Sequence, residues 1–193
     1  YGNGPRYSYF QGCSTGGRQG MMMAQRYPED YDGILAGAPA IHWDRFQAQQ
    51  IWPQVVMRQD LGYVMSAAKQ TLATNTAIAS CDAADGVTDG LLNDPRQCTY
   101  NPVSDATITK DTCTQGDDTC LTRAEAGVMQ KIWGGARNAS GVQLWPGTER
   151  GATTIPMAGP VPFSAATEQG KYFVYLDPNW DWTTLTYANY EAF

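Results

Sequence analysis

The stretch YSYFQGCSTGGRQGMMMAQRYP, residues 7–28, constrains the fold more than any other part of the chain. Residues 7–11 are rich in aromatics and predict a short strand, and residues 18–26 predict a helix that ends before Pro28. The glycines of residues 12–17 are too frequent for the interior of a helix, so this part predicts a tight turn between the strand and the helix.

A second apolar strand is predicted for residues 31–36, where the run Gly37-Ala38-Pro39 ends it. A strand, a tight turn, a helix and a second strand in this order form one right-handed βαβ crossover. Because such a crossover joins parallel strands, the beginning of the chain predicts part of an α/β fold with a parallel sheet.

The sequence after residue 42 has a different character. Residues 43–79 predict two or three helices, among them Trp43–Met57 and Ser66–Ser80. Residues 81–120 are rich in Asp, Gly, Thr and Cys and show little periodicity. This composition predicts loops that are held by something other than a hydrophobic core.

Residues Leu121–Gly134 predict a further helix, because Thr122 can cap its first turn and Glu125, three residues later, completes a capping box. The rest of the chain contains Gly, Pro and aromatic residues without clear periodicity. We therefore expect residues 1–42 to be part of an α/β core, and residues 43–193 to be a large insertion of mixed helix and loop.

The composition excludes several classes of partner. The 193 residues carry a formal net charge of −6, and a surface of this sign repels nucleic acid. No apolar run is long enough to span a bilayer, so we expect neither nucleic acid nor a membrane as a partner. The 11 Tyr and 6 Trp residues are many for this length and can line a pocket for a flat small molecule. The chain opens on Tyr1 without an initiator Met or a signal peptide, and we expect the native N-terminus to be missing.

The pattern Gly12-Cys13-Ser14-Thr15-Gly16 places a serine between a predicted strand and a predicted helix. A strand that runs directly into a helix strains the residue between them and exposes its hydroxyl, and only small neighbours tolerate this turn. We expect Ser14 to be a nucleophile and the Thr15 N–H, at the helix N-terminus, to stabilise an oxyanion. A phosphate-binding turn is the alternative, although the dinucleotide-binding and P-loop patterns do not fit. Cys13 is a weaker candidate for the nucleophile, because its side chain is expected to point away from the oxyanion donors.

Cys81, Cys98, Cys113 and Cys120 form two close pairs within polar loops, which indicates disulfides and an oxidising compartment. Pairing by proximity would join Cys81 to Cys98 and Cys113 to Cys120, but four cysteines allow three connectivities. Zinc ligation is the competing interpretation, and no C-x-x-C spacing or nearby histidine favours it. Asn138-Ala139-Ser140 is an N-glycosylation acceptor pattern that adds a little weight to secretion.

The segment CDAADGVTDGLLNDPRQC, residues 81–98, predicts a calcium site. Three carboxylates, those of Asp82, Asp85 and Asp89, are spaced along a glycine-turned loop and would repel one another without a cation. Hard oxygen ligands in a flexible loop favour Ca²⁺, and the carbonyls of Val87 and Leu91 could complete the set. The spacing is not that of an EF-hand, and an acidic, solvated turn is the alternative.

The run YFQGCSTGGRQGMMMAQRYPEDYDGILAGAPA, followed by a Trp-rich helix and by CDAADGVTDGLLNDPRQC, resembles the tannase and feruloyl esterase family. That family also includes the bacterial mono(2-hydroxyethyl) terephthalate hydrolase. The resemblance implies a partial α/β-hydrolase core in residues 1–42, with a strand, a nucleophile elbow, a helix and a second strand. It also implies that residues 43–193 belong to a lid domain inserted after that second strand.

The resemblance also assigns roles to individual residues. Ser14 matches the nucleophile of the family and the Thr15 N–H matches its oxyanion donor. The calcium ligands of the family match Asp82, Asp85, Val87, Asp89 and Leu91, with calcium in a structural role. The implied lid disulfides are Cys81–Cys98 and Cys113–Cys120, whereas Cys13 matches a cysteine bonded to the neighbour of the catalytic histidine, outside this chain.

The base that would activate Ser14 is missing from this sequence. His42 is the only histidine, and it directly follows the second strand and its turn. In hydrolases built on this elbow the acid and then the histidine follow the serine, and the histidine comes after the last strand. His42 as the base and Asp44 as the acid are therefore the weaker alternatives, and we expect both groups to lie beyond Phe193.

Together with these residues, the resemblance implies a secreted or periplasmic, calcium-stabilised serine esterase that acts on esters of aromatic carboxylic acids derived from plant cell walls or polyphenols. A planar acid would stack on apolar lid residues. The candidates for this wall are Trp145, Phe173, Tyr175, Trp180 and Trp182, although ordinary core is the favoured interpretation for each of them. The alternative is a non-catalytic, calcium-stabilised binding module that keeps a vestigial nucleophile elbow.

Overall fold

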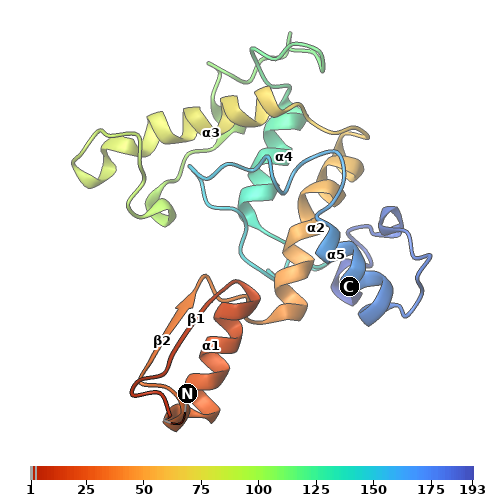
Figure 1. Cartoon of the computed structure of the whole chain (residues 1–193). Helices are drawn as coiled ribbons and strands as arrows, with labels where there is room; N and C mark the ends of the chain where they lie inside the picture. The colour runs from red at the N-terminus through yellow and green to blue at the C-terminus, as the bar shows by residue number, and fades with distance from the viewer. Residues whose placement is uncertain (1, 3) are drawn as a thin grey trace. The chain divides into compact units, whose positions relative to one another are not determined.

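The computed structural model describes residue 2 and residues 4–193. The chain divides into two compact units, Tyr1–Phe46 and Gln47–Phe193, and each is described by itself (Figure 1). The boundary lies within helix α2 (Trp43–Asp60), a few residues after the position at which the sequence predicted a change of domain.

The first unit contains the predicted crossover. Strand β1 (Tyr9–Cys13) pairs in parallel with strand β2 (Gly33–Gly37), and helix α1 (Thr15–Arg26) connects them and packs on both (Figure 1). A 3₁₀ turn (Pro28–Asp30) follows the helix, so Pro28 stands where the helix was expected to stop. The strand–turn–helix–strand order is confirmed, with both strands about two residues later than predicted.

The expectation that residues 12–17 lie outside the helix was wrong in part, because α1 already begins at Thr15 and contains Gly16 and Gly17. Helix propensity disfavours glycine at position 17, and close packing explains why glycine is present there. A Cβ atom on Gly17 would lie 2.2 Å from the carbonyl oxygen of Gly37, so only glycine allows the helix to approach the end of β2. Likewise, a Cβ on Gly12 would lie 2.4 Å from the Gly16 oxygen.

We expect Gly17→Ala to destabilise the protein by about 1–3 kcal/mol, because the added methyl group must displace backbone at the helix–strand contact. Gly16→Ala is the matched control, since a Cβ on Gly16 would have no neighbouring atom within 4 Å and a helical alanine is favoured by about 0.5–1 kcal/mol. Urea unfolding of both variants measures the difference. Equal stability of the two variants would contradict the packing argument.

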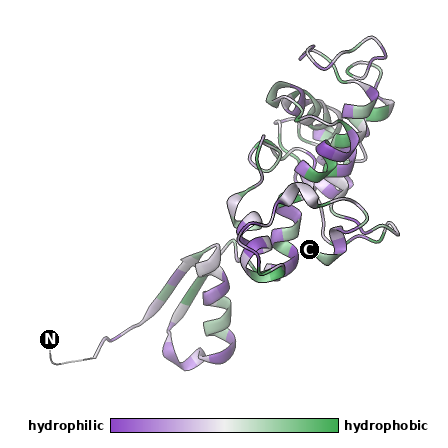
Figure 2. Cartoon of the chain, turned by 90° about the vertical axis from the view of Figure 1, so that its right-hand side faces the viewer, coloured by the Kyte–Doolittle hydropathy of each residue, from purple (hydrophilic) through white to green (hydrophobic). Residues whose placement is uncertain are grey.

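The second unit is built on helices α2 (Trp43–Asp60), α3 (Ala67–Cys81) and α4 (Arg123–Gly134), with the short α5 (Ser164–Gln169) beyond them (Figure 1). Their apolar side chains form its core, with Ile51, Val56, Ala73, Met129 and Ile132 fully buried. The predicted helices are present, and the capping box of Thr122 and Glu125 is formed. None of the described helices combines the length and apolar character of a bilayer-spanning segment, and polar residues interrupt them throughout (Figure 2).

The region between α3 and α4 consists of loops and short 3₁₀ turns, as predicted. The disulfides Cys81–Cys98 and Cys113–Cys120 are both present there. Each disulfide anchors a polar loop at or near the end of a helix. It thereby stabilises a region that lacks a hydrophobic core of its own.

The structure of the C-terminal part was not predicted. Helix α5 continues into a π-helix (Gly170–Val174), where the Trp180 ring occupies the place of a Gly170 Cβ, 2.1 Å away. Trp180 stacks between Tyr175 and Phe193, with ring centroids 4.8 and 5.5 Å apart. This part is therefore organised by aromatic contacts between residues 5 and 13 positions apart, which leave no helical periodicity to detect.

Candidate active site

Ser14 occupies the junction between β1 and α1 in a strained conformation. Its φ is 59° and its ψ is −115°, a region that a residue other than glycine rarely adopts. The residue is exposed, and its hydroxyl does not cap the helix that it precedes. Strain of this kind costs about 1–3 kcal/mol and clusters at functional sites, and the role of Ser14 as a nucleophile stays a prediction with which this backbone geometry is compatible.

Two backbone hydrogen bonds hold the strained residue from the side of β2. The Ser14 N–H donates to the Gly37 carbonyl over 3.1 Å, and the Ser14 carbonyl accepts from the Ala40 N–H, also over 3.1 Å. Sequence reasoning did not identify Gly37 and Ala40 as part of the elbow. The only signal for them was the turn sequence Gly37-Ala38-Pro39 after the second strand.

Thr15 is the first residue of α1, so its N–H has no acceptor within the helix. The partial positive charge of the helix N-terminus favours an anion at the same place. The backbone N–H next to Ser14 is thus suited to stabilise a negative oxygen that develops on a substrate carbonyl.

His42 and Asp44 both lie at the beginning of α2. His42 is exposed, has a φ of 49°, and accepts the Phe46 N–H at its carbonyl over 2.9 Å. Asp44 is exposed in the first helical turn, where the helix dipole favours a carboxylate. Both residues therefore have a structural role at the start of α2. That the catalytic base and acid lie beyond Phe193 stays a prediction.

Cys13, the last residue of β1, has an exposed, free thiol. It borders a surface cavity of about 340 Å³, together with Gln11, Gly12, Leu35 and Gly37. Its bond to a cysteine outside the chain stays a prediction, for which the exposed position leaves the necessary space.

The aspartates of the predicted calcium loop accept hydrogen bonds from the loop itself. The buried Asp82 carboxylate accepts the N–H groups of Asp89 and Gly90 over 3.0–3.2 Å. Asp85 accepts the Val87 N–H over 2.9 Å, and Asp89 accepts the Leu91 N–H over 3.0 Å. Gly86 and Gly90, with φ of 90° and 81°, allow the turns.

The donor chemistry of this loop fits calcium, because it offers carboxylates and loop carbonyls and no soft ligand. Its three carboxylates are nevertheless not gathered around one point. Among the described residues, the one group of three ligand atoms within 4.8 Å is that of Cys113, Asp117 and Cys120. The sulfur atoms of that group are joined in a disulfide, so it is not available as a metal site.

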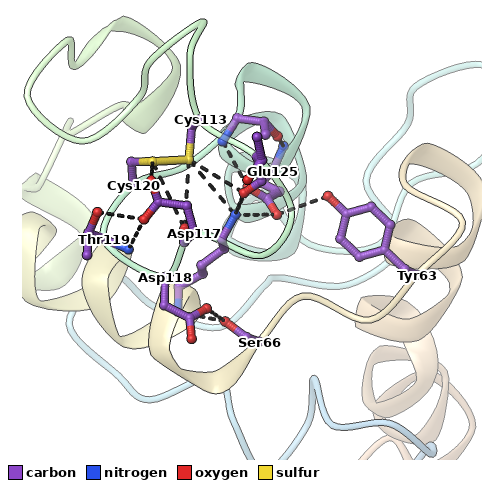
Figure 3. The surroundings of a disulfide bond; sticks show 11 residues. Tyr63, Ser66, Cys113, Asp117, Asp118, Thr119, Cys120 and Glu125 are labelled. Carbon is purple, nitrogen blue, oxygen red and sulfur yellow. Dashed lines mark hydrogen bonds and ion pairs between the residues drawn. A yellow bond between two sulfur atoms is a disulfide. The ribbon is translucent and has the colours of Figure 1, made fainter.

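The Cys113–Cys120 disulfide lies next to a buried ion pair (Figure 3). The Lys69 Nζ lies 2.7 and 2.9 Å from the two Glu125 oxygens, and both side chains are fully buried. Lys69 also donates to the carbonyl of Thr114 in the disulfide loop over 2.7 Å, and Tyr63 donates to Glu125 over 2.9 Å. Burial, and then the Glu125 hydrogen bond, raise the pKa of Tyr63 to about 12, so it stays a neutral donor.

The expected wall residues have different surroundings. Phe173 is 73% exposed, whereas Trp180 and Trp182 pack against the core of the second unit. Tyr175 belongs to the stack on Trp180, and Trp145 is half-buried. Phe173 is thus the one of the five whose side chain is mainly open to solvent.

Asn138 is engaged within its own loop. Its side-chain oxygen accepts the N–H groups of Ser140 and Val142, and its amide group donates to Glu191 over 3.1 Å. Glycosylation at this residue stays a prediction, and it would replace the Glu191 contact.

The chain is similar in sequence to several curated proteins. The "Probable feruloyl esterase" of Arthroderma benhamiae is 38% identical over 192 residues, which cover 95% of this chain and 35% of that protein. "Probable feruloyl esterase B-2" of Aspergillus terreus is 34% identical, covering 96% of this chain and 35% of that protein. The chain thus spans 35% of the length of these curated relatives.

Solved structures show the same relation. The crystal structure of feruloyl esterase B from Aspergillus oryzae superposes with a TM-score of 0.81 at 29% identity, covering 100% of this chain and 39% of that chain. A tannin acyl hydrolase from Aspergillus niger gives a TM-score of 0.74 at 24% identity, covering 90% and 34%, a likeness of fold alone. The model of the family described as "Tannase and feruloyl esterase" matches residues 1–177. With this match over most of its length, the chain belongs to the tannase and feruloyl esterase family.

Proposed function

We propose that this chain provides the nucleophile and the lid of a serine esterase that hydrolyses esters of aromatic carboxylic acids. The observation that carries the proposal is the strained, exposed Ser14 at a β–α junction, in a chain of a family whose relatives are named as feruloyl esterases. The relatives are much longer than this chain. We propose that the catalytic acid and histidine come from outside these 193 residues, in a longer enzyme.

The proposed reaction proceeds through an acyl-enzyme. The Ser14 hydroxyl oxygen attacks the ester carbonyl while its proton passes to the histidine, and the Thr15 N–H donates to the developing oxyanion. The C–O bond to the alcohol then breaks, and the alcohol leaves with the proton from the histidine. Water repeats the attack on the acyl-serine, which releases the aromatic acid and restores the serine.

The substrate class is tested with the complete enzyme and a panel of methyl ferulate, methyl gallate, a terephthalate half-ester and methyl butyrate. We expect at least one aromatic ester to be hydrolysed with a kcat/KM about 10-fold or more above that of methyl butyrate. Faster hydrolysis of the aliphatic ester would contradict the substrate class. Absence of turnover on all four would favour the binding module with a vestigial elbow.

We propose that calcium binds in the loop of residues 81–98, with a structural role. The ligands would be the carboxylates of Asp82, Asp85 and Asp89 and the carbonyls of Val87 and Leu91. Support comes from the oxygen-only donor set and from the glycine turns at Gly86 and Gly90. When bound, the ion would neutralise the carboxylates of this loop and fix its conformation.

We expect chelation by EGTA to lower the melting temperature, because a ligand bound only to the native state stabilises it by about 2.7 kcal/mol at 100 times its Kd. Added Ca²⁺ in excess over the chelator should restore the value. Asp85→Ala is the matched control, since its melting temperature should respond little to EGTA. An unchanged melting temperature of the wild-type protein with EGTA would count against the site.

We further propose that the enzyme is exported to an oxidising compartment. The disulfides Cys81–Cys98 and Cys113–Cys120 support this location. In that compartment Cys13 would form its disulfide with a cysteine outside this chain, next to the catalytic histidine. Such a bond would fix the separation of Ser14 and the histidine.

A further inference from the structure

The segment from the last residue of β2 to the first residue of α2 passes over the beginning of α1, all within the first unit. We call residues 37–43 the strap. Its first residue, Gly37, accepts the Ser14 N–H, and Ala40 donates its N–H to the Ser14 carbonyl, each over 3.1 Å. Between these contacts the strap passes so close to Gly17 that a Cβ there would lie 2.9 Å from the Cα of Pro39. The strap therefore contacts both the serine and the first turn of its helix.

The strap is itself strained. Ala38 and His42 have φ values of 38° and 49°, in the left-handed region that non-glycine residues seldom adopt. Such conformations persist only where the surrounding structure holds them. Hydrogen bonds to Ser14 hold the strap at Gly37 and Ala40, and at its other end His42 accepts the Phe46 N–H at the start of α2.

Arg18 and Trp43 form a further contact between this end of the strap and α1. The Arg18 guanidinium carbon lies 4.8 Å from the centroid of the Trp43 ring, a cation–π geometry between two half-buried side chains. Arg18 lies one helical turn after Ser14, and its N–H donates to the Ser14 carbonyl over 3.1 Å. Trp43 also contacts Phe46, with ring centroids 6.1 Å apart. Contacts thus run from Ser14 through Arg18 to Trp43, and the backbone of the strap leads from Trp43 to Ala40, which contacts Ser14 again.

We propose that Arg18 and Trp43 are positioning residues of the esterase, which hold the strap against the nucleophile elbow and so fix the orientation of Ser14. This inference rests on the proposed function. Neither side chain has a role in bond making, because the strap acts on Ser14 through backbone hydrogen bonds. Loss of the pair would let the strap relax and displace the Ser14 hydroxyl relative to the Thr15 N–H, and small displacements of reacting groups reduce turnover strongly.

The test measures kcat and KM of the complete enzyme on its best aromatic ester. We expect Arg18→Met and Trp43→Leu each to lower kcat by about 10- to 100-fold with KM changed less than about 2-fold. Because the two side chains form one contact, the kcat of the double variant should be no lower than that of the less active single variant. Arg18→Lys keeps a cation and Trp43→Tyr keeps an aromatic ring, so both variants should retain most of the wild-type kcat. Arg26→Met, on the last turn of the same helix, is the control that should leave kcat unchanged.

Several results would overturn the inference. The first is an unchanged kcat in Arg18→Met. The second is a rise in KM alone, which would place the pair in the substrate pocket. The third is a double variant in which the two single reductions of kcat multiply. If Trp43→Leu does not fold, the kcat of Arg18→Met alone tests the inference. Arg18→Met is expected to fold, because Arg18 is a half-buried helical residue and methionine keeps the aliphatic part of its side chain. Ser14→Ala in the same assay separates the two proposals. Full activity there refutes the esterase mechanism, whereas an inactive Ser14→Ala beside a fully active Arg18→Met refutes only the positioning role.

Discussion

Ser14→Ala is expected to lower kcat on an aromatic ester by about 10⁴-fold or more, since it removes the oxygen on which the proposed acyl-enzyme forms. The free energy of unfolding should change by less than about 0.5 kcal/mol, because the exposed hydroxyl caps no helix and alanine adopts the same strained backbone. Activity is measured on the complete enzyme, with urea unfolding of the same samples.

Two matched variants sharpen this prediction. Thr15→Ala removes a side chain but keeps the N–H that would bind the oxyanion, so we expect kcat to stay within about 10-fold of the wild-type value. Ser14→Gly should be as inactive as Ser14→Ala but about 1 kcal/mol more stable, because glycine adopts a φ of 59° without strain. A Ser14→Ala variant with wild-type turnover would refute the assignment of the nucleophile.

Lys69→Met is expected to destabilise the protein by about 3–5 kcal/mol, the largest effect on stability that we predict. Both partners of the Lys69–Glu125 pair are fully buried, so removal of the ammonium leaves an unpaired carboxylate in the interior. Glu125 also accepts the Thr122 N–H in the capping box, which holds its side chain at this buried position. The loss is measured by urea unfolding of the chain.

The control for this prediction is the exposed pair Lys171–Glu168, in which Lys171→Met should cost less than about 1 kcal/mol. In Lys69→Met/Glu125→Gln the second substitution removes the stranded charge and still allows a capping box. We expect this double variant to be more stable than Lys69→Met alone. If Lys69→Met costs no more than Lys171→Met, the buried pair does not have the role that its burial indicates.

The part of the fold that was predictable from sequence is the part in which neighbouring residues decide the structure. The aromatic strand before Ser14, the stop at Pro28 and the capping box of Thr122 are local patterns, and each corresponds to an element that is present. The start of α1 was not predictable, because Gly16 and Gly17 oppose a helix locally. The close approach of Gly17 to Gly37 is a tertiary contact that outweighs this propensity.

The same distinction holds for the candidate site. The candidate roles of Ser14 and Thr15 were predictable from their position between a strand and a helix. Those of Ala40 and Trp43 became evident only from the structure, in which the strap contacts the turn at Ser14 and the helix that follows it. Lys69 and Glu125 are 56 residues apart, and nothing near either of them indicates a buried ion pair. The packing of the Trp180 ring on Gly170, the first residue of the π-helix, is likewise a contact that no local pattern indicates.

The central claim, a covalent intermediate on Ser14, is tested most directly by mass spectrometry of the complete enzyme, quenched with acid shortly after it is mixed with methyl ferulate. The account predicts a mass increase of one feruloyl group, assigned by fragmentation of the peptide to Ser14 and absent from Ser14→Ala. An acyl group on Cys13 or on any other residue, or turnover without a covalent adduct under conditions in which deacylation is slow, would contradict it.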